Sequence, residues 1–300
     1  MIIIMSLKRG TNMKKVKALL LSTVLLTMLF TIPSCKKSKK IERESEEEVI
    51  PIPSSEHSHE EGEESSSEEE VTVTAGSLKE EEFIYFPSYY LNKLNKYSSY
   101  KAVTSGTTHA EVFGMDVPQS IDATVIKGEY SYLKNESHSS LVNTIHEAYY
   151  HDKQAVYRDS KDGEYTSSSL DDYLDKYGVN PLGNNIEGYL LGSGCITSIN
   201  REEVEGNYKF SLEFDIEKAT TNVKIQMKKF GGLDDYPSFS SIKVDVFVKD
   251  DFSPVKIELD SKYKAKKIMD SDCHQTYTVT FSNFDETIEI PNLEEVKTKF

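Results

Sequence analysis

The sequence predicts a mainly β (α+β) domain over residues 83–300, built on an antiparallel sheet with few helices. In its second half, apolar and polar residues alternate strictly over several segments, as in Tyr208–Asp215, which indicates strands with one buried and one solvated face. The 300 residues include 18 Tyr and 13 Phe but no Trp, and such aromatic residues favour strands. Helical periodicity is confined to short segments between the strands.

Composition excludes several classes of function. The 35 Lys and Arg against 50 Asp and Glu give a formal net charge of −15, which repels phosphate backbones, so we expect no nucleic-acid partner. The chain is 37% hydrophobic and 28% charged, which is typical of a globular protein rather than one with many membrane spans.

Residues 1–35 have the pattern of a signal peptide. A basic segment, Met13–Lys17, precedes an uncharged, Leu-rich run over Ala18–Ile32, as in secretory signals. Because the signal is complete from Met13, we expect the true start there rather than at Met1.

The end of this signal resembles the lipobox of bacterial lipoproteins. Ile32-Pro33-Ser34-Cys35 matches at Ile32, Ser34 and Cys35 and departs at Pro33. The resemblance implies that Cys35 becomes the mature N-terminus, carrying diacylglycerol and an added acyl chain such as palmitate. The expected location is then the extracytoplasmic face of the cell membrane, where the lysines of residues 36–40 support an acyl anchor. The alternative is an ordinary secretory signal with a chance Cys.

Residues 36–82 are expected to form a disordered linker. They contain 16 Glu, nine Ser and no aromatic residue, so they cannot bury enough apolar surface to fold. We therefore expect that deleting Glu44–Glu82 leaves folding intact. His57 and His59 lie among these carboxylates, which leaves metal capture by the linker as an alternative to a solvated spacer.

Strands are expected throughout the folded part, punctuated at Val117-Pro118 and at Lys134-Asn135. The first half is predicted to contain strands at Tyr97–Met115, Ile121–Leu133, Ser139–His151, Ala155–Arg158 and Cys195–Ile199. In the second half, alternation predicts one shared face that forms the core or lines a ligand cavity: Phe210, Leu212, Phe214, Val244, Val246, Ile257, Leu259, Tyr277, Val279 and Phe281.

Four helices are expected between the strands. Ser88, the pair Ser168-Ser169 and Asp215 are candidate N-caps. The helix after Asp215 has an apolar stripe that should pack on the face bearing Phe210, Val246 and Val279. The four ranges are Pro87–Lys96, Leu170–Tyr177, Asn185–Leu191 and Ile216–Phe230.

The order of these elements resembles the LolA/LppX superfamily, mainly over Phe214–Ile290. There, a helix leads to a Val-rich strand, then to Pro254–Glu258 and to Tyr277–Asn283. The resemblance implies an unclosed β-barrel, a strongly curved antiparallel sheet with helices on its concave face. It also implies binding of a lipid or of the acyl chains of another lipoprotein.

No motif indicates an enzyme, a cofactor or a metal site in the folded part. Gly192-Ser193-Gly194 lacks the spacing of a nucleophile elbow, and His146 and His151 fall on opposite faces of their predicted strand. Cys195 and Cys273 either form a disulfide in an exported domain or remain as buried thiols.

The leading hypothesis is a membrane-anchored lipoprotein that holds an apolar ligand in its half-barrel. The alternative is a structural or partner-binding module whose concave face is filled by its own helix. Thirty-one Tyr and Phe in the chain make either outcome physically attainable.

Replacing Cys35 with Ala tests the anchor. Without the thiol that receives diacylglycerol, we expect loss of acylation and of firm membrane association, which acyl labelling and fractionation measure. An unchanged membrane fraction for Cys35→Ala would show that the lipoprotein assignment is wrong.

Overall fold

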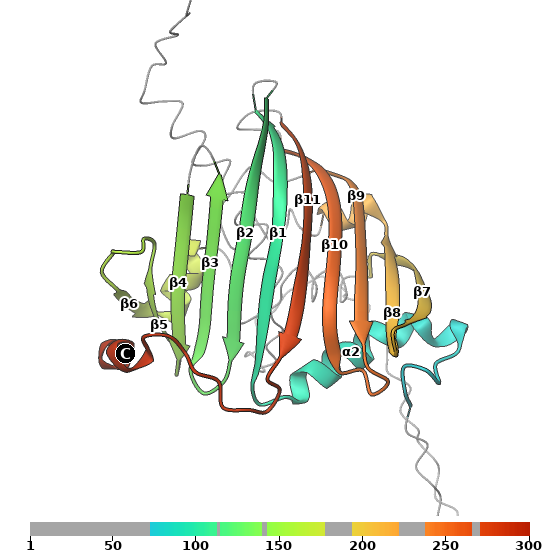
Figure 1. The fold of residues 1–300 in the computed structure, drawn as a ribbon, viewed down its shortest axis with the longest axis horizontal. Coiled ribbons are helices and arrows are strands. Elements are labelled where there is room, and N and C mark those ends of the chain that lie inside the picture. The colour runs from blue at the N-terminus through green and yellow to red at the C-terminus, as the bar shows by residue number, and fades with distance from the viewer. Residues whose placement is uncertain (1–72, 113–114, 140–142, 178–193, 222–237, 266–270) are drawn as a thin grey trace, which may run out of the picture.

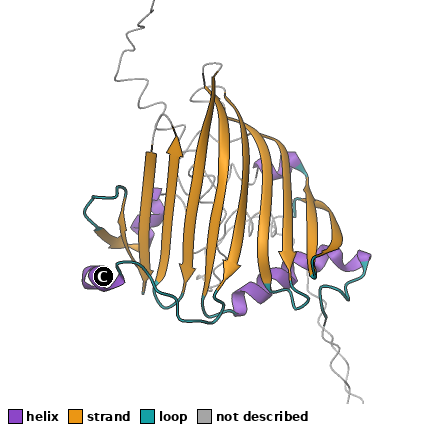
Figure 2. Cartoon of the chain, in the orientation of Figure 1, coloured by secondary structure: helices purple, strands orange, loops and turns teal. Residues whose placement is uncertain are grey.

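A computed structural model describes residues 73–112, 115–139, 143–177, 194–221, 238–265 and 271–300. One antiparallel sheet of 11 strands dominates it (Figures 1 and 2), in the order β6-β5-β4-β3-β2-β1-β11-β10-β9-β8-β7. The strands are β1 Tyr100–Val112, β2 Met115–Lys127, β3 Ser131–Ser139, β4 Asn143–His151, β5 Gln154–Arg158, β6 Thr166–Ser169, β7 Ile196–Val204, β8 Asn207–Phe214, β9 Ser238–Val248, β10 Pro254–Ala265 and β11 Ser271–Ser282.

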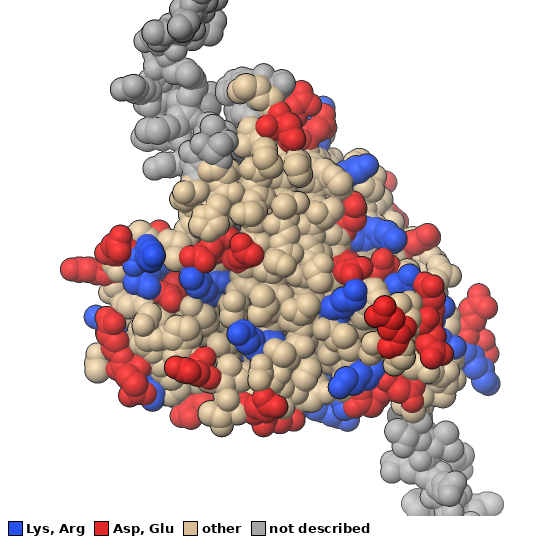
Figure 3. Space-filling view, viewed as in Figure 1, with Lys and Arg blue, Asp and Glu red and all other residues tan. Residues whose placement is uncertain are grey.

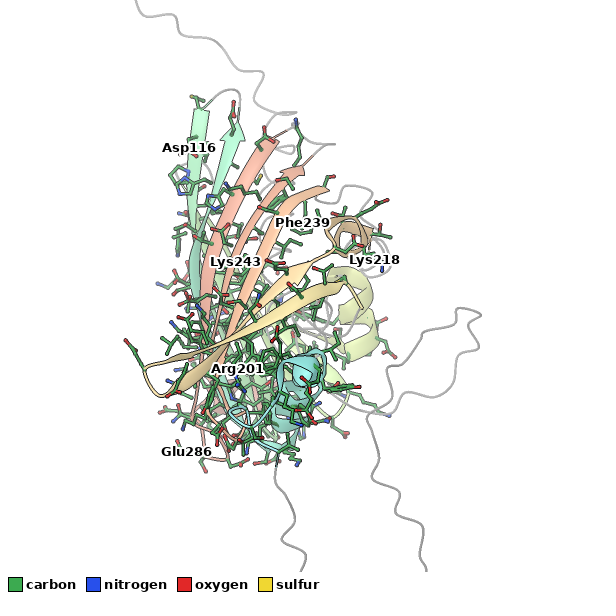
Figure 4. The ribbon with its side chains drawn as sticks, turned by 90° about the vertical axis from the view of Figure 1, so that its right-hand side faces the viewer. Asp116, Arg201, Lys218, Phe239, Lys243 and Glu286 are labelled. Atoms are coloured by element: carbon green, nitrogen blue, oxygen red, sulfur yellow. The ribbon has the colours of Figure 1, made fainter. Side chains whose placement is uncertain are left out.

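The sheet does not close into a barrel. Strands β6 and β7 are its two edges, and β1 joins the first half to the second by pairing with both β2 and β11. Viewed from the side, the sheet curls, with α2 (Phe86–Lys96) and α3 (Leu170–Tyr177) on one side (Figure 4). We call that side the inner face and the opposite side the outer face. The mainly β, unclosed and curved antiparallel fold predicted from the sequence is thus confirmed.

Two predicted strand boundaries are wrong. Val117-Pro118 lies within β2, and Lys134-Asn135 lies within β3. Pro118 lies near the start of β2, before the first described pairing of β2 with β3 at Gln119, and proline is tolerated near strand starts and edges. The chain instead turns between β2 and β3, around Gly128. The edge strand β6 was not predicted.

The helices follow the predictions closely in position but not always in their caps. Ser169 accepts a bond from the backbone N–H of Asp172, and Asp215 accepts one from that of Lys218, so both act as caps. Ser88 does not, because α2 begins earlier with Tyr85 as its N-cap. The elements are η1 Glu80–Tyr85, α2 Phe86–Lys96, α3 Leu170–Tyr177, α6 Leu293–Val296 and η2 Lys297–Lys299.

Part of the predicted helix after Asp215 can be assessed. Residues 216–221 are helical. Ala219 is buried and Ile216 packs against the main core, as the predicted stripe requires. The remainder of that helix and the predicted helix at Asn185–Leu191 lie outside the described residues. No helix in the described ranges combines the length and hydropathy of a membrane span.

Helix α2 covers the inner face at one end of β8–β10. Phe86 stacks on Phe210 with ring centroids 3.8 Å apart, and Phe83 meets the same ring edge-on. Tyr90 and Leu94, one and two turns further along, are fully buried. This end of the half-barrel is therefore filled by the chain's own aromatic residues.

The outer face is not solvated throughout, contrary to the prediction. Beyond β11, the C-terminal segment crosses the outer face of the first half of the sheet (Figure 1), and a second apolar cluster forms beneath it around Tyr149 and Val296. Glu147, 2% exposed, accepts hydrogen bonds there from Tyr132, Tyr165 and Arg158. Tyr149 also donates to the carbonyl of Pro291. These bonds explain how the sheet tolerates a buried carboxylate.

The folded domain begins earlier than Phe83, which corrects the linker boundary. Ala75 and Leu78 are buried in the main core. The Arg201 guanidinium donates to the carbonyls of Ala75, Gly76 and Leu78 at 2.6, 3.0 and 2.8 Å. The expectation that Glu44–Glu82 can be deleted without harm therefore conflicts with these contacts at its C-terminal end.

Substituting Arg201 tests this anchor. Arg201→Met should lower the free energy of unfolding by about 2 kcal/mol, because hydrogen bonds from a charged donor are lost. Urea unfolding measures it, with the exposed Lys243→Met on β9 as the matched control, expected to change stability by less than about 0.5 kcal/mol. Deleting residues 36–72 should be neutral. Equal stability after deleting 36–78 would contradict the anchoring role.

A second tie joins α2 to the turn between β9 and β10. Lys93 Nζ lies 2.7 Å from Asp251 Oδ2. Burial alone would raise the pKa of Asp251, but hydrogen bonds from Lys93 and Ser253 outweigh it and lower the pKa to about 2. The carboxylate form is therefore favoured by folding.

This pair predicts acid sensitivity. Because the folded pKa of Asp251 lies below the unfolded value, its contribution is complete above about pH 4 and is lost as pH falls towards 2. Asp251→Asn should lower stability at pH 7 by less than about 1 kcal/mol, since the Asp251 side chain is 58% exposed and solvent screens the pair. Urea midpoints at several pH values should converge for variant and parent at pH 2. An undiminished difference at pH 2 would contradict the assignment.

Candidate functional site

Strand register orders the inner face into rows that run across the sheet. Side chains directly opposite each other on neighbouring strands share a face. One row contains Ile257, Val279, Thr104, Ala123 and Asn135, on β10, β11, β1, β2 and β3 in turn.

The residues predicted to share one face do so. Nine of the ten are buried, and Phe281 is partly buried against the same core. Phe210 packs against α2, whereas Ile257, Leu259, Tyr277 and Val279 lie on the two strands beside β1. The complete set is Phe210, Leu212, Phe214, Val244, Val246, Ile257, Leu259, Tyr277, Val279 and Phe281.

A buried polar row interrupts this apolar face. Thr108 on β1 is opposite Gln275 on β11, which is opposite Ser261 on β10. Thr108 and Ser261 are 1% exposed and Gln275 is 0% exposed. Their hydroxyl and amide atoms have no hydrogen-bond partner within the structure as described. We refer to these three residues as the polar row.

On β2 and β3, the polar row is followed by two polar residues that hydrogen-bond to each other. Gln119 is opposite Thr108, and its amide nitrogen donates to the hydroxyl of Ser137. Closer to α2, Thr104 and Asn135 are also buried without hydrogen-bond partners among the described residues. Buried polar groups without partners are rare in folded proteins and require an explanation.

Apolar or uncharged residues border the polar row on both sides. One adjoining row contains Leu259, Tyr277, Gly106, Ile121 and Ser137, and the other contains Tyr263, Cys273, Ala110 and Val117. None of these is charged. A Cβ on Gly106 would collide with Tyr277 and the Thr276 backbone, so glycine allows β1 and β11 to approach closely here.

Ionisable groups beside the polar row are held in neutral forms. Burial raises the pKa of the Cys273 thiol to about 11 and raises that of its opposite neighbour, Tyr263, well above its usual value. Desolvation disfavours the charged form of each group. The polar row therefore lies in a neutral environment of low polarity.

His146 lies on the inner face but is held by protein contacts. Its two ring nitrogens are 2.8 Å from Asp159 Oδ1 and 2.6 Å from the Tyr173 hydroxyl of α3. His151 stacks on Tyr130 on the other face, so the two histidines are apart, as their spacing predicts. Glu147, adjacent to His146 in sequence, faces the outer side with Tyr132.

Cys195 and Cys273 are buried thiols and do not form a disulfide in the structure. Cys273 is on β11 and Cys195 precedes β7, four positions away in the sheet order. Strands are about 4.8 Å apart, so their separation along the sheet greatly exceeds the reach of a disulfide. The disulfide alternative is therefore wrong, and the alternative of two buried thiols holds.

The outer face presents a second, more open feature. Charged side chains surround a broad uncharged stretch in the middle of this face (Figure 3). Near the ends of β1 and β11, a depression of about 560 Å³ is lined by outer-face residues that include His109, Asp116 and His274, and also by Tyr263 and Cys273 of the inner face. His109 and His274 are directly opposite each other. In the described ranges, no group of three or more side chains is arranged to hold a metal ion.

Sequence reasoning missed the polar row. The signal was present as polar residues at inner-face positions of alternating strands, namely Ser261 after Leu259 and Gln275 before Tyr277. Alternation alone identifies those positions as inward-facing. Only the register between strands shows that they are neighbours.

Comparisons with known proteins identify solved structures of related shape. LprF from Mycobacterium bovis is 15% identical, with 70% of this chain and 95% of LprF covered and a TM-score of 0.38. The LolA superfamily protein NE2245 from Nitrosomonas europaea is 10% identical, with 75% and 97% covered and a TM-score of 0.26. A DUF1329 family protein from Desulfovibrio piger is 9% identical, with 71% and 95% covered and a TM-score of 0.26. No family model and no curated protein matches the chain.

Proposed function

We propose that this chain is a membrane-anchored extracytoplasmic lipoprotein that binds a lipid or other apolar ligand against the inner face of its open sheet. The single observation that carries the proposal is the polar row, because the chain buries these groups without supplying their partners. A core completed by its own side chains satisfies such groups or replaces them with apolar ones. The lipobox-like segment ending at Cys35 supports the anchor.

A filled structural or partner-binding module is the second candidate, and one observation favours it. Helix α2 occupies one end of the inner face through the Phe86–Phe210 stack. This packing covers the inner face at β8 with the chain's own aromatic side chains. It leaves Thr108, Gln275 and Ser261 on the central strands without partners, so we favour ligand binding there.

Uptake of an apolar fluorescent probe such as pyrene tests the proposal. The chain from residue 36 onward retains every residue of the described fold and should take up the probe saturably, because its inner face is apolar. Ala123→Phe adds a ring to the inner face of β2 and should reduce uptake. Thr124→Phe, the next residue on the outer face of the same strand, is the matched control and should not.

Two results would contradict the proposal. One is the absence of saturable probe uptake by the unaltered chain, which would favour the filled module. The other is undiminished uptake by a folded Ala123→Phe variant, which would place the probe elsewhere. Circular dichroism checks folding, because overpacking commonly costs about 1–3 kcal/mol.

A further inference from the structure

The polar row also restricts the chemistry of the ligand. We propose that the inner face selects a neutral amphiphile of the acylglycerol type, with its ester or hydroxyl groups on Thr108, Gln275 and Ser261. This inference rests on the proposed function and specifies the ligand class of the same site. The inference depends on the hydrogen-bonding groups of the polar row, on the residues that surround these groups and on the spacing between them.

The offered groups match a neutral oxygen-rich partner. The Gln275 amide has two N–H donors and a carbonyl acceptor, and each hydroxyl both donates and accepts. Opposite positions on adjacent strands hold their Cβ atoms about 4.5–5.5 Å apart. Three such positions in line extend over about 9–11 Å, a length suited to a glycerol backbone together with its ester groups, whose carbonyls accept and whose free hydroxyl donates and accepts.

The surroundings exclude a charged partner. The four rows from the one with Val279 to the one with Cys273 include no Asp, Glu, Lys or Arg on β10, β11, β1, β2 or β3. A phosphate or carboxylate at the polar row would find no counter-charge on these five strands, and burying an unpaired charge costs several kcal/mol. A neutral polar group incurs no such cost once it is hydrogen-bonded.

The apolar rows on each side favour acyl chains over a compact polar solute. Leu259, Tyr277 and Ile121 border the polar row on the side nearer α2, and Val117 and Ala110 border it on the other. A sugar or free glycerol would leave these side chains unmatched. A hydrocarbon would match them and leave the polar row unsatisfied, so only an amphiphile satisfies both.

Competition for the bound pyrene probe tests the inference on the chain from residue 36 onward. The competitors are dioleoylglycerol, dioleoyl phosphatidic acid, which has the same chains and an anionic group, and squalene, which has no polar group. Dioleoylglycerol should compete at least about tenfold better than either, since a tenfold preference needs only about 1.4 kcal/mol.

Substitutions then locate the preference. A triple variant combines Thr108→Val, Ser261→Ala and Gln275→Leu. In this variant the preference for dioleoylglycerol over the other two competitors should fall below about twofold, while squalene still competes. The ligand-free triple variant should also melt at a higher temperature than the parent, because buried groups without partners have been removed. The matched outer-face control, Thr278→Val with Ser105→Ala, should keep the preference.

The outcomes separate this inference from the proposed function. Probe uptake with equal competition by all three lipids would overturn only the inference. The groups of the polar row would then be hydrated by water and would not select the ligand. A preference that persists in the triple variant, or a lower melting temperature for that variant, would also overturn it. A parent chain that takes up no probe would overturn the proposed function and the inference together. Thr108→Val alone, which conserves shape, keeps the test available if the triple variant does not fold.

Discussion

The sheet depends on one constraint, that hydrogen-bonding groups removed from water must find partners. At two other buried sites the chain itself meets the constraint. Glu147 is matched by two tyrosines and an arginine on the outer face, and Arg201 is matched by three carbonyls of the N-terminal segment. The contrast with Thr108, Gln275 and Ser261 makes the inner face of the central strands the candidate site.

The open sheet explains why such a site arises in the middle of the protein. An unclosed sheet of 11 strands has a large inner face and two edges. In the described ranges, α2 packs on the second half through Phe86, and α3 contacts the first half through Tyr173. The central strands β1 and β11 lie between them, and it is there that the polar row crosses the sheet.

Alternation in the sequence was sufficient to predict the fold class and the shared face that includes Val246, Ile257 and Val279. Prediction from alternation failed where contacts between residues far apart in sequence decided the structure. Pro118 indicated a break, yet it lies within β2 and pairs with His109 of β1. Ala75 was assigned to the linker, yet Arg201 binds its carbonyl. The polar row could not be predicted, because neighbours across β10, β11 and β1 are far apart in sequence and meet only through register.

The central claim is that a ligand's polar group completes the polar row. A crystal structure of the protein with a dioleoylglycerol analogue brominated along its acyl chains tests it most directly. Anomalous signal should follow the inner face, with glycerol oxygens about 3 Å from the Gln275 amide and the Thr108 hydroxyl. Bromine signal confined to the outer face, or Gln275 and Thr108 bonded to the protein's own atoms, would contradict the account.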